Sequence, residues 1–253
     1  NQQDTDQAIA AVAAAADRGV EVPPGFWQAA ETHWRGTQLP RGGWGYMETL
    51  GRLRPKPYRS MTAGAVVALY RCLDHLPRGE YARCEQPPEH EAIQRGLAWL
   101  TEHYTVDATR HDVLRYYYWM YGLARVGGVL GRRRLGEHDW YADGSRALRS
   151  LQNDDGSWGR AHATRSTCYA VLFLARAGAP DVLRKLRYRG RWNARPRDAA
   201  HLARWMHAAF ERPLGWSVAE ADNDANTLRP APIVYLSGAR SEEHTSELQS
   251  LLI

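Results

Sequence analysis

Three neighbouring residues, Cys72, Asp74 and His75, are of the types that bind zinc or activate a thiolate. Ligands on one helix must share a face, at spacings of three or four residues, and Asp74 follows Cys72 by only two. His201 and His207 are six residues apart and also fail this spacing. We therefore expect structural roles for Cys72 and His75, and we predict neither a metal ion nor another cofactor.

Other nucleophile and phosphate motifs do not occur in the sequence. It contains no G-x-S-x-G elbow, no Walker motif and no dinucleotide-binding glycine pattern. The 3 cysteines are an odd number without a C-x-x-C pair, which argues against a disulfide framework. Cys168 lies between Thr167 and Tyr169 in an apolar segment, so we expect it, like Cys72 and Cys84, to be a small buried group.

The elements that must position these residues repeat along the chain. The motif Q-x-x-x-G-x-W-G occurs twice. Each copy follows a segment with apolar residues at helical spacing, and each precedes a more uniformly apolar segment, directly or after a short insert. The motif therefore separates the two helices of a repeating pair. Its residues are Gln38, Gly42 and Trp44 in the first copy and Gln152, Gly156 and Trp158 in the second.

The expected helices alternate between two kinds. Those at 4–18, 26–34, 90–104 and 138–152 carry one apolar stripe, whereas those at 60–76, 112–126 and 166–177 are apolar on most faces. Residues 62–69 align with 167–174, and residues 123–127 align with 174–178, which gives a repeat of about fifty residues. One helix pair cannot bury its own faces, so the pattern predicts an array or a closed ring with two concentric layers.

The motif and the helix-pair period resemble the repeats of the terpene cyclase and protein prenyltransferase superfamily, including squalene-hopene cyclases. The resemblance covers residues 1–180 and implies a mainly α fold, an α/α toroid of inner and outer helices. In each motif, we expect the glutamine amide to bond free backbone groups at a helix terminus and the tryptophan ring to lie over it. The glycine lets the chain turn closely.

The catalytic groups of this superfamily have no matching positions here. Such cyclases protonate an alkene with the central aspartic acid of a D-x-D-D motif, which is absent from this sequence. Asp154 and Asp155 are explained by the turn before Gly156, and the acidic residues of 222–224 lie outside the repeats. The zinc ligands of the prenyltransferases, an Asp, a Cys and a His, are not matched by Cys72 and its neighbours. No catalytic residue is therefore predicted.

Aromatic residues are the remaining candidates for a site. In cyclases of this kind, aromatic faces line the central lumen, where they stabilise cations and suit isoprenoid chains. Aromatic side chains crowd segment 112–126 and point all around the helix, so most must pack the core. Tyr117 and Tyr121 share a face and are the predicted lumen pair, together with Tyr169 on the equivalent later helix.

The character of the chain changes after Pro180. Residues 184–197 are basic and irregular, 198–210 form an amphipathic helix, and 216–220 and 233–236 read as short strands. This part, residues 181–239, resembles the entry into an uncharacterised bacterial domain that often follows such repeats and is similar to glutamine amidotransferases in fold. We expect the truncated start of an α/β domain here.

Both ends of the sequence carry further expectations. Residues 240–253 include a stretch that resembles a translated sequencing adapter, so we expect an artefact there and a natural protein truncated near Ala239. The chain begins at Asn1 rather than at methionine, so its true start is expected to lie upstream. The absence of a signal peptide therefore carries no information.

Charge and hydropathy narrow the set of partners. The formal net charge is +5, but only Lys56 and Lys185 are lysines, and the arginine clusters lie in polar segments without interleaved aromatics. We expect a solvated surface there and no nucleic acid. No apolar run is long enough for a transmembrane segment. The resemblance implies an exported or envelope-associated location in a bacterium.

The sequence therefore predicts a repeat protein that acts as a non-catalytic binding or interaction module, with an isoprenoid or other apolar ligand, or a protein, as its partner. Two alternatives stay open. One is a prenyl-chain cyclase or transferase whose catalytic motif lies in missing sequence, and the other is an isoprenoid carrier. The sequence alone does not decide whether the protein is an enzyme.

Overall fold

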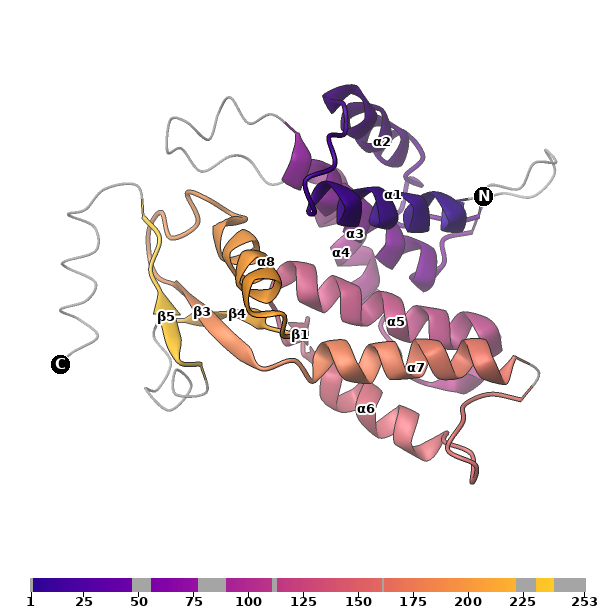
Figure 1. Cartoon of the computed structure of the whole chain (residues 1–253). Helices are drawn as coiled ribbons and strands as arrows, with labels where there is room; N and C mark the ends of the chain where they lie inside the picture. Colours follow the sequence, from indigo (N-terminus) through magenta and orange to yellow (C-terminus); the bar gives the residue numbers. More distant parts are fainter. Residues whose placement is uncertain are drawn as a thin grey trace. The chain divides into compact units, whose positions relative to one another are not determined.

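A computed structural model of the chain describes residues 2–46, 56–76, 90–110, 113–160, 162–221 and 231–238. These residues are mainly helical, as expected (Figure 1). The chain divides into two compact units. The first comprises Asn1–Pro77, Glu89–Val129 and Arg134–Ala177, and the second comprises Arg78–Pro88, Leu130–Arg133 and Gly178–Ile253. Cys84, the acidic residues of 222–224 and the expected artefact at 240–253 lie outside the described residues.

The first unit is helical, and the expected helices are present with small shifts at their ends. A short 3-10 turn at Ala108–Arg110 and a small hairpin, β1 (Arg134–Leu135) with β2 (His138–Asp139), connect some of them. Asp139 caps the helix that follows, because its side chain accepts a hydrogen bond from the Ala142 amide. The helices are α1 (Gln2–Ala16), α2 (Pro24–Gly36), α3 (Arg59–His75), α4 (Glu91–Glu102), α5 (Val113–Leu130), α6 (Trp140–Ser150) and α7 (Ala163–Ala177).

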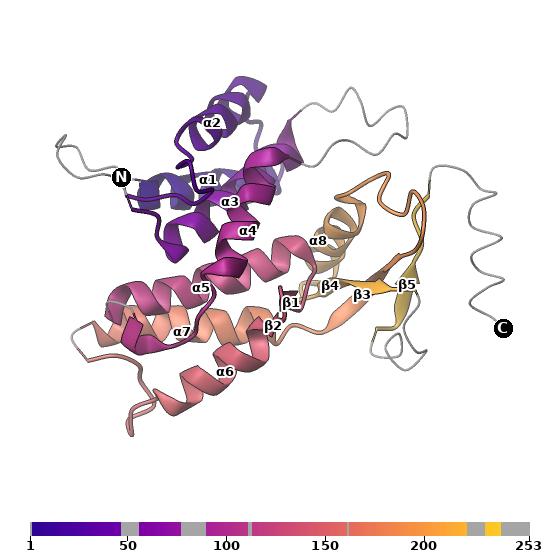
Figure 2. The same cartoon turned by 180° about the vertical axis from the view of Figure 1, so that it is seen from behind.

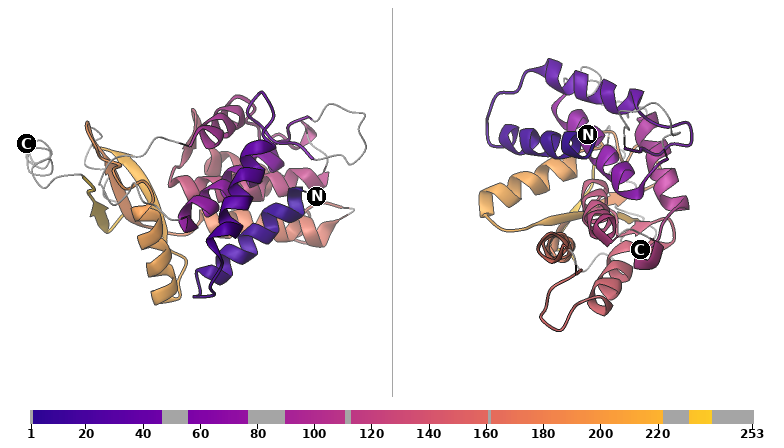
Figure 3. Two further views of the ribbon diagram at one scale, coloured as in Figure 1. Left: turned by 90° about the horizontal axis from the view of Figure 1, so that it is seen from above. Right: turned by 90° about the vertical axis from the view of Figure 1, so that its right-hand side faces the viewer.

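The alternation of half-exposed and buried helices is confirmed for α2 to α6. Helix α3 is buried on nearly all faces, whereas α2, α4 and α6 each keep a solvent face. Helices α5 and α7 lie side by side and run in the same direction (Figures 1 and 2), and the right-hand view of Figure 3 looks along them. Parallel neighbours of this kind are compatible with the inner layer of a toroid, but a closed ring stays a prediction.

Helix α7 differs from the expectation. It was predicted to be apolar and buried, yet Cys168, Val171 and Leu172 are exposed, and only its other face, with Ala170 and Phe173, is buried. Cys168 is therefore not the buried thiol that the sequence suggested, whereas Cys72 is buried. Burial raises the pKa of the Cys72 thiol to about 12, and the nearby charge of Glu31 adds to this effect. Cys72 is thus an inert thiol, in line with a structural role.

The two motif copies share one hydrogen bond of the glutamine. The glutamine amide donates to the glycine carbonyl four residues later, at 2.7 Å from Gln38 to Gly42 and 2.9 Å from Gln152 to Gly156. Gln38 also donates to the Ala92 carbonyl in the first turn of α4, at 2.8 Å. The glutamine therefore closes the motif loop and, in the first copy, ties it to the next helix pair.

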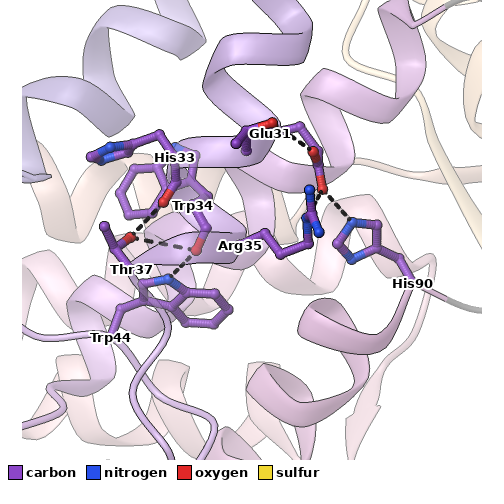
Figure 4. Close-up of polar contacts among 8 residues, drawn as sticks. Glu31, His33, Trp34, Arg35, Thr37, Trp44 and His90 are labelled. Atoms are coloured by element: carbon purple, nitrogen blue, oxygen red, sulfur yellow. Dashed lines mark hydrogen bonds and ion pairs between the residues drawn. The ribbon is translucent and has the colours of Figure 1, made fainter.

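The glutamines were expected to bond free backbone groups at a helix terminus. At the ends of α2 and α6 the tryptophans do so instead. The Trp44 indole N–H donates to the Trp34 carbonyl at the end of α2, at 2.8 Å (Figure 4). The Trp158 indole donates likewise to the Leu148 carbonyl near the end of α6, at 2.7 Å. Carbonyls in the last turn of a helix lack their usual partner four residues later, so the indole adds a donor there. The Trp34 carbonyl also accepts from Thr37 Oγ1 at 3.4 Å, and the Leu148 carbonyl also accepts from the Leu151 amide at 3.1 Å. Figure 4 also shows Glu31 of α2 between Arg35 and His90, at 2.9 and 3.1 Å.

A threonine ties each motif to the helix that follows. The backbone amide of Trp44 donates to Thr62 Oγ1 on α3 at 3.0 Å, and that of Trp158 donates to Thr167 Oγ1 on α7 at 2.9 Å. Since the sequence alignment had paired Thr62 with Thr167, these bonds confirm its register. Position 63 of α3 thus corresponds to 168 of α7, and position 66 to 171.

The two motif glycines offer a matched pair of substitutions. Both have positive φ, 96° at Gly42 and 82° at Gly156, which strains any other residue. A Cβ at Gly42 would lie 2.6 Å from the Arg95 carbonyl oxygen, whereas one at Gly156 would meet almost nothing. We expect Gly156→Ala to lower the free energy of unfolding by about 1 kcal/mol and Gly42→Ala by about 2–4 kcal/mol. Urea denaturation measures both, and equal losses would contradict the close approach at Gly42.

The second unit is built on a parallel sheet. Its elements are β3 (Asp181–Arg187), α8 (Asp198–Phe210), β4 (Gly215–Glu220) and β5 (Ile233–Tyr235). The strand order is β4-β3-β5, with β3 parallel to both neighbours, and α8 packs on β3 and β4. The region from Arg184 onward was predicted to be irregular, but Arg184 to Arg187 belong to β3. It is a central strand whose apolar pattern is interrupted by a buried lysine, Lys185.

Candidate functional site

A buried ion pair joins α1, the first helix of the helical unit, to α5. Asp6 of α1 is fully buried, and Arg125 of α5 is 7% exposed. The guanidinium binds the carboxylate through two bonds, Nη1 to Oδ2 at 2.7 Å and Nη2 to Oδ1 at 2.8 Å. Helix α3 approaches the pair through Gly64, where a Cβ would lie 2.9 Å from Asp6 Oδ2. The fork geometry is the one that holds a carboxylate most firmly.

A tyrosine completes the coordination of Asp6. The Tyr118 hydroxyl donates to Asp6 Oδ2 at 3.1 Å. Burial, together with the charge of Asp6, raises the pKa of Tyr118, so this hydroxyl keeps its proton. Burial disfavours the charged form of Arg125, but the charge of Asp6 outweighs this effect and the pKa of Arg125 is raised. Both oxygens of Asp6 accept hydrogen bonds from these donors. The arrangement is that of a structural ion pair rather than of an acid poised to protonate an alkene.

Two of the three predicted lumen residues meet beside this pair. The rings of Tyr121 and Tyr169 stack with centroids 5.5 Å apart, and Tyr118 lies 5.4 Å from Tyr169. The Arg125 guanidinium lies 5.3 Å from the centre of the Tyr121 ring, within the range of a cation–π contact. Tyr121 and Tyr169 are both half-buried, and burial raises the pKa of Tyr169. Helices α5 and α7 are thus joined through an aromatic cluster that already holds a cation.

The third predicted residue lies elsewhere. Tyr117 is buried, and its ring makes an edge contact with Tyr116 at 5.1 Å. It packs beside the second motif, where a Cβ at Gly159 would lie 3.5 Å from its ring. Tyr117 and Tyr121 are one turn apart on α5, but different segments cover them. The structure therefore brings Tyr121 and Tyr169 together and leaves Tyr117 with the motif loop.

The ion pair was not predicted, although the sequence contains a signal for it. Asp6 lies three residues before Ile9 and seven before Ala13, on the buried stripe of α1. An acid on an apolar stripe requires a buried partner. Arg125 is likewise a charged residue that lies among buried residues, those of α5. Nothing in the sequence indicated that these two residues, more than a hundred positions apart, would meet.

The exposed face of α7 is the other distinctive feature of the helical unit. Val171 and Leu172 are 49% and 39% exposed, and Cys168 lies one turn before them. The equivalent residues of α3 are buried. A Cβ at Gly122 of α5 would lie 3.0 Å from the Ala63 side chain, and one at Gly96 of α4 would lie 2.9 Å from that of Val66. The helix pair α4–α5 thus covers on α3 the face that α7 exposes.

Comparisons with known proteins add no relatives. Neither family models, nor curated proteins, nor solved structures gave a match to this chain. Among the described residues, no helix is both long enough and apolar enough to pass through a membrane.

Proposed function

We propose that the helical unit is a non-catalytic binding module that takes a helical protein partner onto the exposed face of α7. The observation that carries this proposal is the register between α3 and α7. The face formed by Cys168, Val171 and Leu172 corresponds to a face of α3 that is covered by a helix pair. Adjacent exposed apolar side chains of this kind are typical of an interaction surface.

The chemistry of the face defines the partner. On α3, glycines of the covering helices let them approach closely, at Gly96 and Gly122. Small and aliphatic residues on both sides suit the helix-in-groove mode of recognition, in which apolar side chains recur at helical spacing. Arg165 is exposed one turn from Cys168, so a partner with acidic residues flanking its apolar stripe fits best.

The test uses the chain's own helix pair as a probe. Residues 90–130, fused to a soluble carrier, are titrated into the full chain and followed by calorimetry. We expect saturable binding with a Kd of about 10 µM, weakened about tenfold or more by Val171→Asp, since a buried charge opposes docking. Val20→Asp, at another exposed valine, is the matched control and should bind normally.

Two results would overturn this proposal. One is that the helix pair does not bind at all, and the other is that Val171→Asp binds it as well as the unsubstituted chain. Circular dichroism must show that each variant retains its helices. The carrier alone must give no heat.

A second candidate function rests on a different observation. The half-buried Tyr121–Tyr169 stack offers aromatic faces that suit the apolar chain of an isoprenoid. We propose it as an alternative site for an isoprenoid carrier. Saturable binding of geranylgeranyl phosphate, lost in Tyr169→Ala but kept in Val171→Asp, would favour this alternative over the protein-binding module. A prenyl-chain enzyme would in addition have to convert that ligand.

A further inference from the structure

The second unit carries a feature that is independent of the helical unit and of its proposed function. Strand β3 comes first in the chain, β4 lies on one side of it, and β5 lies on the other. The order of the strands therefore changes direction between β3 and β5. In open parallel sheets, ligands bind outside the carboxyl ends of the strands at such a switch point. The segments that reach this edge follow Arg187 of β3 and Tyr235 of β5.

A buried charged network fixes this edge of the sheet. Lys185, two residues before the end of β3, is only 1% exposed. Its ammonium group donates to Asp198 Oδ1 at 2.6 Å, to the Arg195 carbonyl at 3.0 Å and to Asn193 Oδ1 at 3.1 Å. These bonds use all three of its protons. Lys185 therefore ties the loop between β3 and α8 to the sheet at several points.

Strand β5 belongs to the same network. The Tyr235 hydroxyl donates to Asp198 Oδ2 at 3.0 Å. The Tyr188 hydroxyl, at the start of the loop, donates to the Ser237 carbonyl just after β5, at 2.9 Å. Asp198 thus binds side chains from both strands of the switch point. A loop held in this way loses little further entropy when a ligand binds to it.

The loop between β3 and α8, which this network holds, is strongly basic. Between Arg187 and Asp198 it contains Arg189, Arg191, Arg195 and Arg197, and the first three of these are exposed. Gly190 has a φ of 127°, so the chain turns between Arg189 and Arg191 in a conformation that favours glycine. Asp198 already neutralises Lys185. The positive charge of the loop therefore exceeds the negative charge that its own network supplies.

Trp192 adds a flat surface to this loop. Its ring is half-buried, and the Lys185 ammonium and the Arg187 guanidinium lie 5.6 and 5.5 Å from its centre. Arg187 also approaches Glu220 of β4, at 3.4 Å. These contacts hold the Trp192 ring against the end of β3. Arg189 and Arg191 lie on either side of the turn at Gly190 and are exposed.

We propose that the carboxyl edge of β3 and β5 is a binding site for a small phosphate-bearing molecule, held by Arg189 and Arg191 on a loop that Lys185 and Asp198 position. Guanidinium groups bind phosphate oxygens through paired hydrogen bonds, which suits them to this role. Lys185 does not touch the ligand. It is a positioning residue, because its three protons are taken up within the loop.

Inorganic pyrophosphate is the probe for this site, titrated into the full chain by calorimetry. We expect a Kd below about 100 µM at about 0.1 M salt. Arg189→Ala and Arg191→Ala, at exposed positions that should not disturb folding, should each weaken binding at least about tenfold. Arg149→Ala on α6, which removes an exposed arginine from the other unit, is the matched control and should change the Kd by less than about twofold.

The role of Lys185 is tested separately. Lys185→Met should weaken pyrophosphate binding while Asn193→Ala, which removes a single bond to Lys185, should weaken it less. If Lys185→Met does not fold, the two arginine variants still decide the matter. The proposal is overturned if pyrophosphate does not bind at about 5 mM, or if Arg191→Ala binds it normally. It is also overturned if a short single-stranded DNA binds this loop and pyrophosphate does not displace it.

Discussion

Replacement of Asp6 by asparagine is expected to lower the free energy of unfolding by about 3–5 kcal/mol. The reason is that Arg125 remains in the core with its full charge and loses the carboxylate that both of its terminal nitrogens bind. Tyr118 loses a charged acceptor at the same time. Urea denaturation followed by far-ultraviolet circular dichroism measures the loss.

Two further variants show whether burial is the cause. Arg146→Ala removes an exposed partner of Asp143, with the two charged groups 3.6 Å apart, and should cost at most about 1 kcal/mol. The double replacement Asp6→Leu with Arg125→Met removes both buried charges and should recover much of the stability lost in Asp6→Asn. If Asp6→Asn costs no more than Arg146→Ala, the ion pair is not the structural centre described above.

Replacement of Trp44 by alanine should have an effect of similar size, about 3–5 kcal/mol. The ring is fully buried and fills the space above Gly96, where a Cβ would lie 2.7 Å from it. Its indole N–H is also the donor for the Trp34 carbonyl. The loss therefore combines a cavity with the loss of this hydrogen bond, and thermal and urea denaturation measure it.

Trp44→Phe separates these two contributions. A phenyl ring retains much of the packing but has no N–H, so we expect a loss of about 1 kcal/mol from the missing hydrogen bond, since Thr37 Oγ1 still reaches the Trp34 carbonyl at 3.4 Å. Trp158→Phe removes the equivalent bond to Leu148 in the second motif and should behave in the same way. If both phenylalanine variants are as stable as the unsubstituted protein, the indole hydrogen bonds do not stabilise the repeat.

The helices of the first unit could be predicted because periodicity and turn residues are local signals. The motif loops begin and end where the two copies of Q-x-x-x-G-x-W-G suggested, and Thr62 and Thr167 occupy equivalent places. Burial could not be predicted in the same way. Helix α7 has the composition of a buried helix, but the exposure of Val171 depends on whether a neighbour covers it.

The features missed in the sequence depend on distant pairings. Strand β3 was overlooked because a buried lysine interrupts its apolar alternation, and Lys185 is tolerated only because Asp198 and the loop satisfy its protons. Tyr117 and Tyr121 share a helix face, yet only Tyr121 meets Tyr169, since neighbouring segments differ along that face. Position on a helix predicted the direction of these side chains but not what lies opposite them.

The reactivity of Cys168 tests most directly whether the exposed face of α7 takes a helical partner. The thiol lies in that face, whereas Cys72 is buried with a pKa raised to about 12 and should not react. Cys84→Ser removes the third thiol. With the helix pair 90–130 present at saturation, alkylation of Cys168 by iodoacetamide should slow at least about tenfold. An unchanged rate while the helix pair is bound would show that the partner does not cover this face of α7.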